Sequence, residues 1–450
     1  MFNTAPKRIG WFCVFCIVII GGWFTATILM PSLAATPANV PVWKIQVTPW
    51  AGDQHIAFTP DGKQVLDSFS DRRNKTHGIR RWDVASGKEL APITSEGKIP
   101  LLSKNGMFYA IFGKQENQSP KIRIYRVLDQ KQIGEILASS IDGTVVEIIG
   151  TKPLIVIQHL QNTAVINSPS IQRSYSFWDV TNKKFLQSKS HQTTLYDTYS
   201  FPEDVAFSND GTKAYSLWTV FTQTSKGKTS QYAEGLEPWP DNSLVGKPKE
   251  AWLLNEVNGK IVKLPFSKQT PGIQFIWKKP ALSKDEALLA ATSTNDPGGW
   301  SDNGEDGSVR CYDLPHQKLR WVYYKKHNMP DKFLFSPDGM MLANGGYDNE
   351  YNNNGGYLNI LNTKTGKLIH SFTEQTLWQQ ISDRTRKFIT DKAYGTSFLK
   401  KQFGKSMEKY YRKPPPGNSG LPISLAWSPD SKMLAAAYAD GSMKLWRVNK

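Results

Sequence analysis

The sequence predicts an all-β protein built from a repeated four-stranded unit, and three observations lead to this prediction. A short apolar segment that ends in Ser-Pro-Asp-Gly, or in a variant of it, recurs along the chain. Further segments rich in β-branched and aromatic residues follow, which is the composition of strands. Gly, Asp, Asn and Pro separate them at the short spacing of antiparallel turns. Seven such units follow one another along the chain.

The first strand and its turn are visible in six of the units. They read IAFTPDG (56–62), PLLSKNG (100–106), VAFSNDG (205–211), PALSKDE (280–286), FLFSPDG (333–339) and LAWSPDS (425–431). The remaining unit begins within residues 145–158 and lacks this turn.

The third strands carry the residues that point to a known family. Trp82-Asp83 and Trp178-Asp179 are dipeptides of its type, and the last unit combines the turn Asp440-Gly441 with Trp446. On these residues the chain resembles the WD-repeat family, as a divergent member. The resemblance implies a seven-bladed β-propeller of four-stranded antiparallel blades. The family's Gly-His dipeptide is missing from every unit, so the hydrogen-bond network built on it is not expected here.

The two ends of the repeat region complement each other. The last unit offers only three strands before Lys450, while VWKIQVTPW (42–50) belongs to no unit. We expect residues 42–48 to be the fourth strand of the last blade, which would close the ring and remove an open sheet edge.

The N-terminus has the layout of an export signal. Lys7 and Arg8 precede an apolar stretch, Ile9–Met30, and the small-residue pattern Ser32-Leu33-Ala34 follows. Residues 1–35 are therefore predicted to be a signal peptide, or else a helical membrane anchor, because the apolar stretch is long enough to span a bilayer. In either case residues 36–450 form the exported domain, in the periplasm or outside the cell. Attachment to a membrane through residues 9–30 stays open.

Motif analysis argues against catalysis. The chain has three Cys, seven His and no nucleophile elbow, phosphate loop or dinucleotide fingerprint. Two Asn/Asp/Gly-rich loops, 295–308 and 345–356, contain oxygen ligands, but their spacing fits turns better than a Ca²⁺ site. We therefore predict no catalytic residue, no metal and no cofactor.

Connection lengths predict which side of the disc binds. First-to-second and third-to-fourth turns share one side and are tight, whereas second-to-third connections and links between blades share the other. The longer segments all fall in the second set: 71–78, 114–120, 161–174, 188–203, 222–249, 295–307, 346–356 and 374–420. Function tends to lie on loops held by a rigid scaffold, so we expect this side to be the binding surface.

The largest insertion, 374–420, is strongly basic. Between Arg384 and Lys413 it holds ten Lys and Arg residues against two acidic ones, in a chain of net charge +16. Such a segment attracts an acidic protein, an anionic polymer or anionic lipid. The candidate partner-binding residues are Trp239, Trp300, Tyr347, Tyr351, Arg384, Arg386, Lys387, Lys400, Lys401, Tyr410 and Arg412.

These observations favour a non-catalytic exported scaffold that binds a protein or an anionic envelope polymer. Nucleic acid is not an expected partner, because the export signal argues against it. The alternative is a propeller enzyme, such as a hydrolase, a lactonase or a quinone-dependent oxidoreductase, with its site in the central channel. The sequence does not indicate an oligomeric state.

Overall fold

The computed structural model is all-β, with no α-helix among the residues it describes. These residues are 15–20, 23–28, 41–47, 55–71, 76–95, 99–113, 120–138, 144–165, 168–186, 205–208, 210, 212–225, 228–234, 248–255, 260–264, 275–294, 307–325, 328–348, 355–372 and 420–448. The chain divides into two compact units, Met1–Val40 and Pro41–Lys450.

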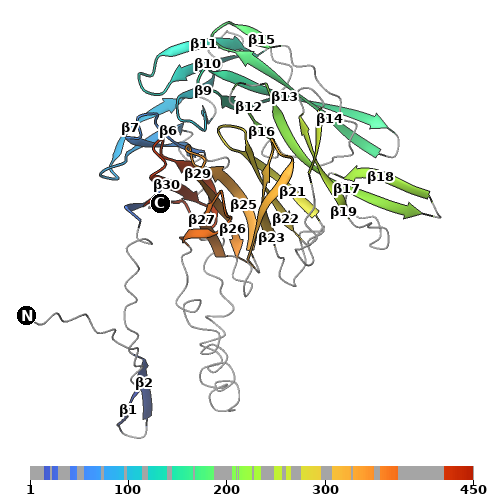
Figure 1. Ribbon diagram of the computed structural model, residues 1–450. Coiled ribbons are helices and arrows are strands. Elements are labelled where there is room, and N and C mark those ends of the chain that lie inside the picture. The colour runs from blue at the N-terminus through green and yellow to red at the C-terminus, as the bar shows by residue number, and fades with distance from the viewer. Residues whose placement is uncertain are drawn as a thin grey trace, which may run out of the picture. The chain divides into compact units, whose positions relative to one another are not determined.

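The larger unit contains seven antiparallel sheets of the predicted kind, which we call blades 1 to 7 (Figure 1). Blade 1 is β4 (Ile56–Phe58), β5 (Gln64–Asp71), β6 (Thr76–Asp83) and β7 (Glu89–Ser95). Blade 2 is β8 (Leu101–Leu102), β9 (Phe108–Gly113), β10 (Lys121–Arg126) and β11 (Gln132–Leu137). Blade 3 is β12 (Thr144–Ile149), β13 (Leu154–Val165), β14 (Ser168–Asp179) and β15 (Lys184–Leu186).

Blades 4 to 7 complete the set. Blade 4 is β16 (Ala206–Phe207), β17 (Ala214–Ser225), β19 (Pro248–Asn255) and β20 (Ile261–Leu264), with β18 (Lys228–Glu234) as a fifth strand on β17. Blade 5 is β21 (Phe275–Leu282), β22 (Leu288–Thr294), β23 (Gly307–Asp313) and β24 (Lys318–Tyr324). Blade 6 is β25 (Asn328–Phe335), β26 (Met341–Asp348), β27 (Gly355–Asn362) and β28 (Leu368–Ser371). Blade 7 is β29 (Pro422–Trp427), β30 (Met433–Tyr438), β31 (Ser442–Arg447) and the N-terminal strand β3 (Trp43–Gln46).

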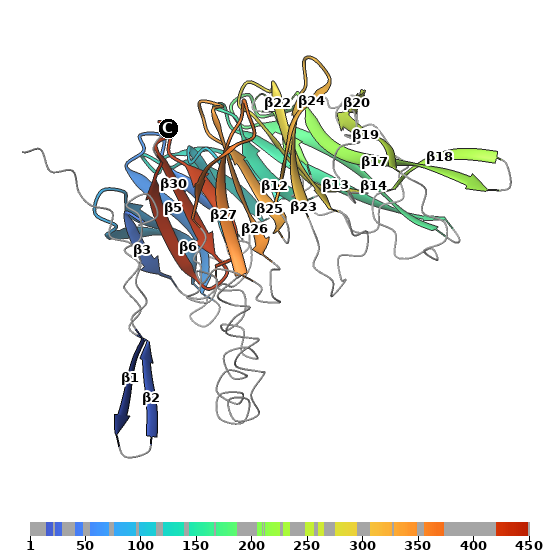
Figure 2. The ribbon, with the colours of Figure 1, turned by 60° about the horizontal axis from the view of Figure 1, so that its bottom comes forward.

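Ring closure occurs as the sequence predicts. β3 pairs antiparallel with β31, with Trp43 opposite Leu445 and Gln46 opposite Ser442. The first and last blades therefore lie side by side, as the blue and red strands show in two views (Figures 1 and 2). The seven-bladed propeller and its closing strand are both confirmed.

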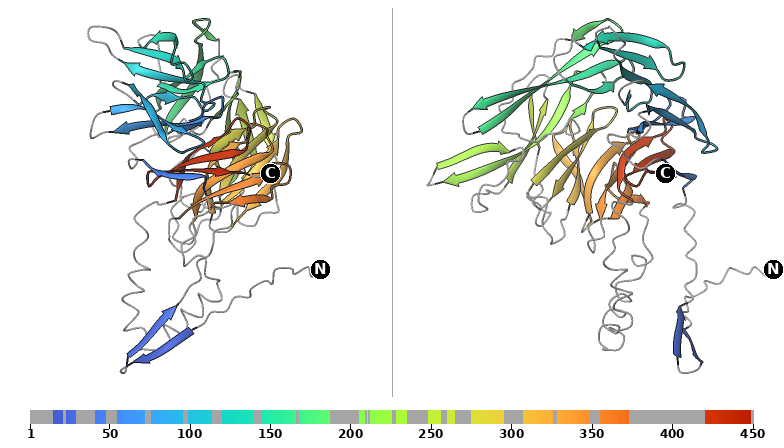
Figure 3. Two further views of the ribbon diagram at one scale, coloured as in Figure 1. Left: turned by 90° about the vertical axis from the view of Figure 1, so that its left-hand side faces the viewer. Right: turned by 180° about the vertical axis from the view of Figure 1, so that it is seen from behind.

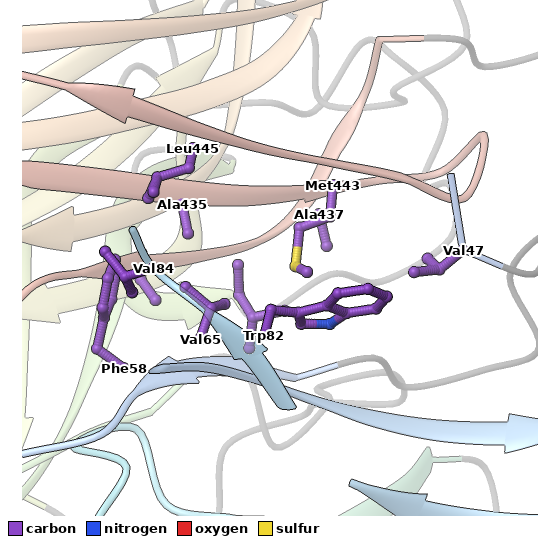
Figure 4. Packing of buried hydrophobic residues seen from close by; sticks show 11 residues of the cluster. Val47, Phe58, Val65, Trp82, Val84, Ala435, Ala437, Met443 and Leu445 are labelled. Carbon is purple, nitrogen blue, oxygen red and sulfur yellow. The ribbon is translucent and has the colours of Figure 1, made fainter. Parts of the chain in front are cut away.

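The blades are held together by apolar side chains that alternate between their two faces. Seven buried clusters in the described part of the chain each join one pair of neighbouring blades. At the closing boundary, Val65 and Trp82 of blade 1 pack against Ala437 and Met443 of blade 7 (Figure 4). Since each strand has a side-chain period of two, one face of a blade meets the preceding blade and the other the following blade.

The recurrent Ser-Pro-Asp-Gly turn has a common hydrogen-bond pattern. In blade 7 the Ser428 hydroxyl donates to Asp430 Oδ1 at 2.6 Å and accepts from the Met433 amide at 2.8 Å. The Ser428 hydrogen bond lowers the pKa of Asp430 below its usual value, while partial burial opposes this. The same hydroxyl-to-oxygen bond recurs in Thr59–Asp61, Ser103–Asn105, Ser208–Asp210, Ser283–Asp285 and Ser336–Asp338.

Two tryptophans join neighbouring blades through a turn glycine. Trp43 donates its indole N–H to the carbonyl of Val84 at 3.1 Å, and a Cβ at Gly87 would lie 2.9 Å from its ring. Trp321 of blade 5 repeats this contact with blade 6, donating its indole N–H to the Thr363 carbonyl at 2.7 Å beside Gly366. Both glycines have positive φ, +68° and +71°, so the turn requires glycine for its backbone as well as for space.

The structure corrects two of the predicted loops. Residues 161–174 are mostly strand, because β13 and β14 stay paired to Val165 and Ser168. In 222–249, β17 continues to Ser225 and pairs with β18, which forms a hairpin (Figure 3, right, green). β-branched residues such as Thr163, Val165, Thr222 and Thr224 lie in the paired strands, which form extended hairpins at the ends of their blades.

The N-terminal unit also differs from the prediction. Within Ile9–Met30 we expected a helix, but the structure has an antiparallel pair, β1 (Phe15–Ile20) and β2 (Trp23–Ile28). Gly21-Gly22 lies between these strands in the sequence, and Ile, Val, Thr and aromatic residues, which favour strands, fill them. No helix among the described residues is long and apolar enough to cross a bilayer. Cleavage after Ala34 or Ala35, like the domain division at residue 35, stays a prediction.

Replacing Trp43 with Ala tests the closing strand. We expect Trp43→Ala to lower the free energy of unfolding by about 2–3 kcal/mol, less than for a fully buried aromatic because Trp43 is only half-buried. Chemical denaturation followed by fluorescence measures this, with Lys44→Ala, an exposed neighbour on the same strand, as the control. Equal midpoints for the two variants would show that β3 does not stabilise the ring.

Candidate functional site: the neck of the basic insertion

The bounds of the strands show that connections are short on one side of the disc and long on the other. The turns between the first and second strands of the blades are all short: the shortest spans residues 150–153 and the longest residues 208–213. The turns between the third and fourth strands are equally short. The other set includes 187–205, 226–247 and 372–421. The longest connection therefore links blade 6 to blade 7, where the basic insertion begins and ends.

The insertion enters through a buried aromatic residue. Phe372 follows β28, is 6% exposed and donates its backbone N–H to the Leu358 carbonyl at 2.7 Å. Its ring stacks on Trp446 of blade 7, with centroids 4.9 Å apart and planes 30° apart. The His370 ring also stacks on Phe372, with centroids 5.9 Å apart. The entry is thus fixed in the apolar boundary between the two blades.

The chain returns through a close backbone contact. A Cβ on Gly356 would lie 1.6 Å from the Gly420 carbonyl oxygen, so the two segments touch without any side chain between them. Leu421 is 5% exposed, and its carbonyl accepts a hydrogen bond from the Ala439 amide at 2.9 Å. Pro422 then lies against Gly345, whose Cβ would be 2.5 Å from the proline ring.

Both ends therefore contact the same strand. Entry is held at Leu358 and exit at Gly356, two residues apart on β27, or about 7 Å at the usual rise of a strand. We call Phe372, Gly420 and Leu421, with Gly356 and Leu358, the neck. The insertion leaves and rejoins the propeller at a single point.

The boundary beside the neck contains a buried cation. Lys444, 2% exposed, lies with its Nζ 4.4 Å from the centre of the Tyr438 ring. A cation over an aromatic face is attracted by the ring quadrupole, more strongly where water is excluded. Tyr438 also meets Trp446 edge-on at 6.2 Å. The aromatic cluster thus connects the entry residue with blade 7.

Of the candidate residues, Tyr347 lies in β26, opposite Gly356 of the neck in the strand register. The others lie outside the described residues: Trp239, Trp300, Tyr351, Arg384, Arg386, Lys387, Lys400, Lys401, Tyr410 and Arg412. The neck residues were not predicted. The paired glycines at 345–346 and 355–356, with Gly420, were the available signal, since glycines in strands mark close backbone approach.

Two kinds of reactive group are at issue among the described residues: a metal-binding cluster and an activated thiol. No group of three or more His, Cys, Asp or Glu side chains among them could hold a metal ion. Burial raises the pKa of the Cys311 thiol to about 12, so it stays protonated at neutral pH and is a poor nucleophile. The strand aromatics Trp82, Tyr312 and Trp446 are core residues, as their positions in the repeat predict.

Comparisons with known proteins agree with the repeat. The last blade matches the family model described as "WD domain, G-beta repeat" over residues 415–447. The chain is similar to the small ribosomal subunit protein RACK1 of Drosophila melanogaster, at 22% identity over 152 residues. This covers 32% of this chain and 46% of that protein, so the chain spans less than half the length of the relative it matches. Among solved structures, hydrazine synthase of Kuenenia stuttgartiensis is similar at 13% identity and a TM-score of 0.43, over 93% of this chain and 99% of that one.

Excising the insertion tests the neck. We expect a chain in which a short Gly-Ser linker replaces residues 374–419 to keep the propeller, because both ends of the insertion contact β27 at positions only two residues apart. Circular dichroism and thermal unfolding measure this. A matched variant that replaces 188–203, which joins the separate blades 3 and 4, provides the comparison. Loss of the β signal on excising 374–419 would show that the insertion is part of the ring.

Proposed function

We propose that this chain, a divergent WD-repeat β-propeller, is a scaffold that binds an acidic protein partner through its basic insertion. Proteins of the WD-repeat family generally act as scaffolds for protein interactions and are typically not enzymes. The observation that carries the proposal is the neck, which holds the most basic segment of the chain at one point of a rigid ring. Binding loops on rigid scaffolds are the usual arrangement for recognition.

Electrostatics supports an acidic partner. The insertion holds ten basic and two acidic residues between Arg384 and Lys413. One exposed ion pair contributes only about 0.2–1 kcal/mol, so six pairs together contribute about 1–6 kcal/mol. Attraction of this kind raises the association rate and weakens as salt increases. The interleaved aromatics, such as Tyr410, offer apolar contact area to the same partner.

The proposal includes export of the propeller to the periplasm or the cell exterior. Its support is the basic, apolar and small-residue order of residues 7–34. Mass spectrometry of the mature protein is expected to show the loss of residues 1–34 or 1–35. A full-length mass in an isolated membrane fraction would instead assign residues 9–30 as an anchor. A full-length mass in the cytosol would contradict export.

A charge-removal variant tests the binding role. Substituting Arg384, Arg386, Lys387, Lys400, Lys401 and Arg412 with Gln should weaken binding of labelled poly-L-glutamate, a surrogate for an acidic protein surface, by tenfold or more. This follows because each 1.4 kcal/mol is about a factor of ten. Fluorescence anisotropy at increasing salt measures both the affinity and its salt dependence.

The control removes three lysines from the opposite side of the disc. Lys63, Lys284 and Lys364 lie on tight turns and are exposed, so replacing them with Gln should change the affinity less than twofold. Equal losses of binding free energy per charge removed in the two variants would mean that net charge alone decides binding and would contradict the proposal. Binding to anionic lipid vesicles but not to poly-L-glutamate would also overturn it.

A further inference from the structure

We propose that β27 is the mount of the basic insertion, and that Gly356, Gly420 and Phe372 are positioning residues for partner binding. This inference rests on the proposed function and identifies the residues that hold the two ends of the insertion at the ring. It concerns only the described residues at the base, which fix where and how the insertion joins the ring.

At the exit, there is no space for a side chain on Gly356. The peptide group between Gly420 and Leu421 lies against Gly356, and a Cβ on Gly356 would come within 1.6 Å of the Gly420 oxygen and 2.3 Å of the Leu421 nitrogen. Separations of this size require backbone movement, because neither atom belongs to a flexible side chain. Gly420 also has φ of +93°, which other residues adopt only with strain. Two glycines therefore set the path of the returning chain.

The entry contact is rigid for a different reason. Phe372 is bonded to Leu358 through its backbone and packed between His370 and Trp446 through its ring. Trp446 is itself 2% exposed, in the core of blade 7. A residue fixed by a hydrogen bond and by two ring contacts has few alternative rotamers.

The entropy cost of closing the insertion is similar in size to the free energy gained by burying side chains at the neck. Closing a loop of this length costs about 3 kcal/mol in chain entropy plus a constant. Burying Phe372 and Leu421 contributes about 1.5–3 kcal/mol each. The two contributions are similar in size, so both ends are needed to keep the neck closed. Weakening one end would free that end of the insertion without unfolding the blades.

A closed neck lowers the entropy that binding must overcome. A segment held at both ends loses less freedom when a partner binds than one with a loose end. The gain appears mainly as slower dissociation. Residues at the base therefore affect affinity although they do not touch the partner.

The test is Gly356→Ala, measured against the same poly-L-glutamate probe. We expect the dissociation constant to rise about three- to tenfold, mostly through faster dissociation, and the thermal midpoint to fall while the β signal of the ring is kept. Hydrogen exchange supplies a reading that does not depend on binding: the Ala439 amide, bonded to Leu421, should lose protection. Gly113→Ala is the matched control, because its Cβ meets only the end of the Arg123 side chain, at 3.3 Å.

A second pair of variants keeps the proposal open to refutation if Gly356→Ala fails to fold. Phe372→Ala should weaken binding to a similar degree, and Phe372→Leu, which keeps most of the buried volume but not the ring stacking, should restore part of it. Unchanged affinity in both Gly356→Ala and Phe372→Ala, when excision of 374–419 abolishes binding, would overturn the mount and leave the scaffold function intact. No loss of binding on excision would instead refute the scaffold function.

Discussion

The structure depends on one constraint: every blade must bury both of its faces. A four-stranded sheet with apolar side chains on two sides is stable only between two neighbours, and a row of such sheets ends in two unsatisfied blades unless it closes. The chain meets this requirement with seven inter-blade clusters and with β3, which pairs the first residues of the propeller with the last. Trp43 and Trp321 then join neighbouring blades through a turn glycine, at positions too small for any other residue.

The requirement that each blade pack against two neighbours also explains why the turns on one side of the disc are tight. Its hydroxyl-to-carboxylate bonds fix the hairpins, and cross-blade contacts such as Asn105 to the Gly150 carbonyl at 2.7 Å join adjacent turns. Little variation is possible there without disturbing two blades at once. The opposite side carries the longer connections. Additions to the fold therefore gather on that side, as the extended hairpins of blades 3 and 4 and the basic insertion do.

Most of the ring could be predicted from sequence because its elements repeat. The Ser-Pro-Asp-Gly turns, the third-strand aromatics and the spare strand at 42–48 gave seven blades, the closure and the WD-repeat resemblance, all of which are confirmed. Structural features that occur only once in the chain were harder to predict. The strand extensions at 161–174 and 222–249 were expected as loops, and the apolar N-terminus as a helix, because each has no repeat to compare with. The neck went unseen because Gly356 and Gly420 are 64 positions apart in the numbering and meet only in space.

The pairing of β3 with β31 has a consequence for how the molecule is made. Gln46 and the Asp440 carbonyl, joined at 2.8 Å, are separated by 394 residues, so the first strand of the propeller has no partner until the last has been synthesised. Contacts of such sequence separation form slowly. Throughout translation the chain holds an unpaired edge at one end and an incomplete sheet at the other. The ring therefore closes only after β31 has been synthesised. A chain whose synthesis stops before β31 keeps an open sheet edge and is prone to aggregation.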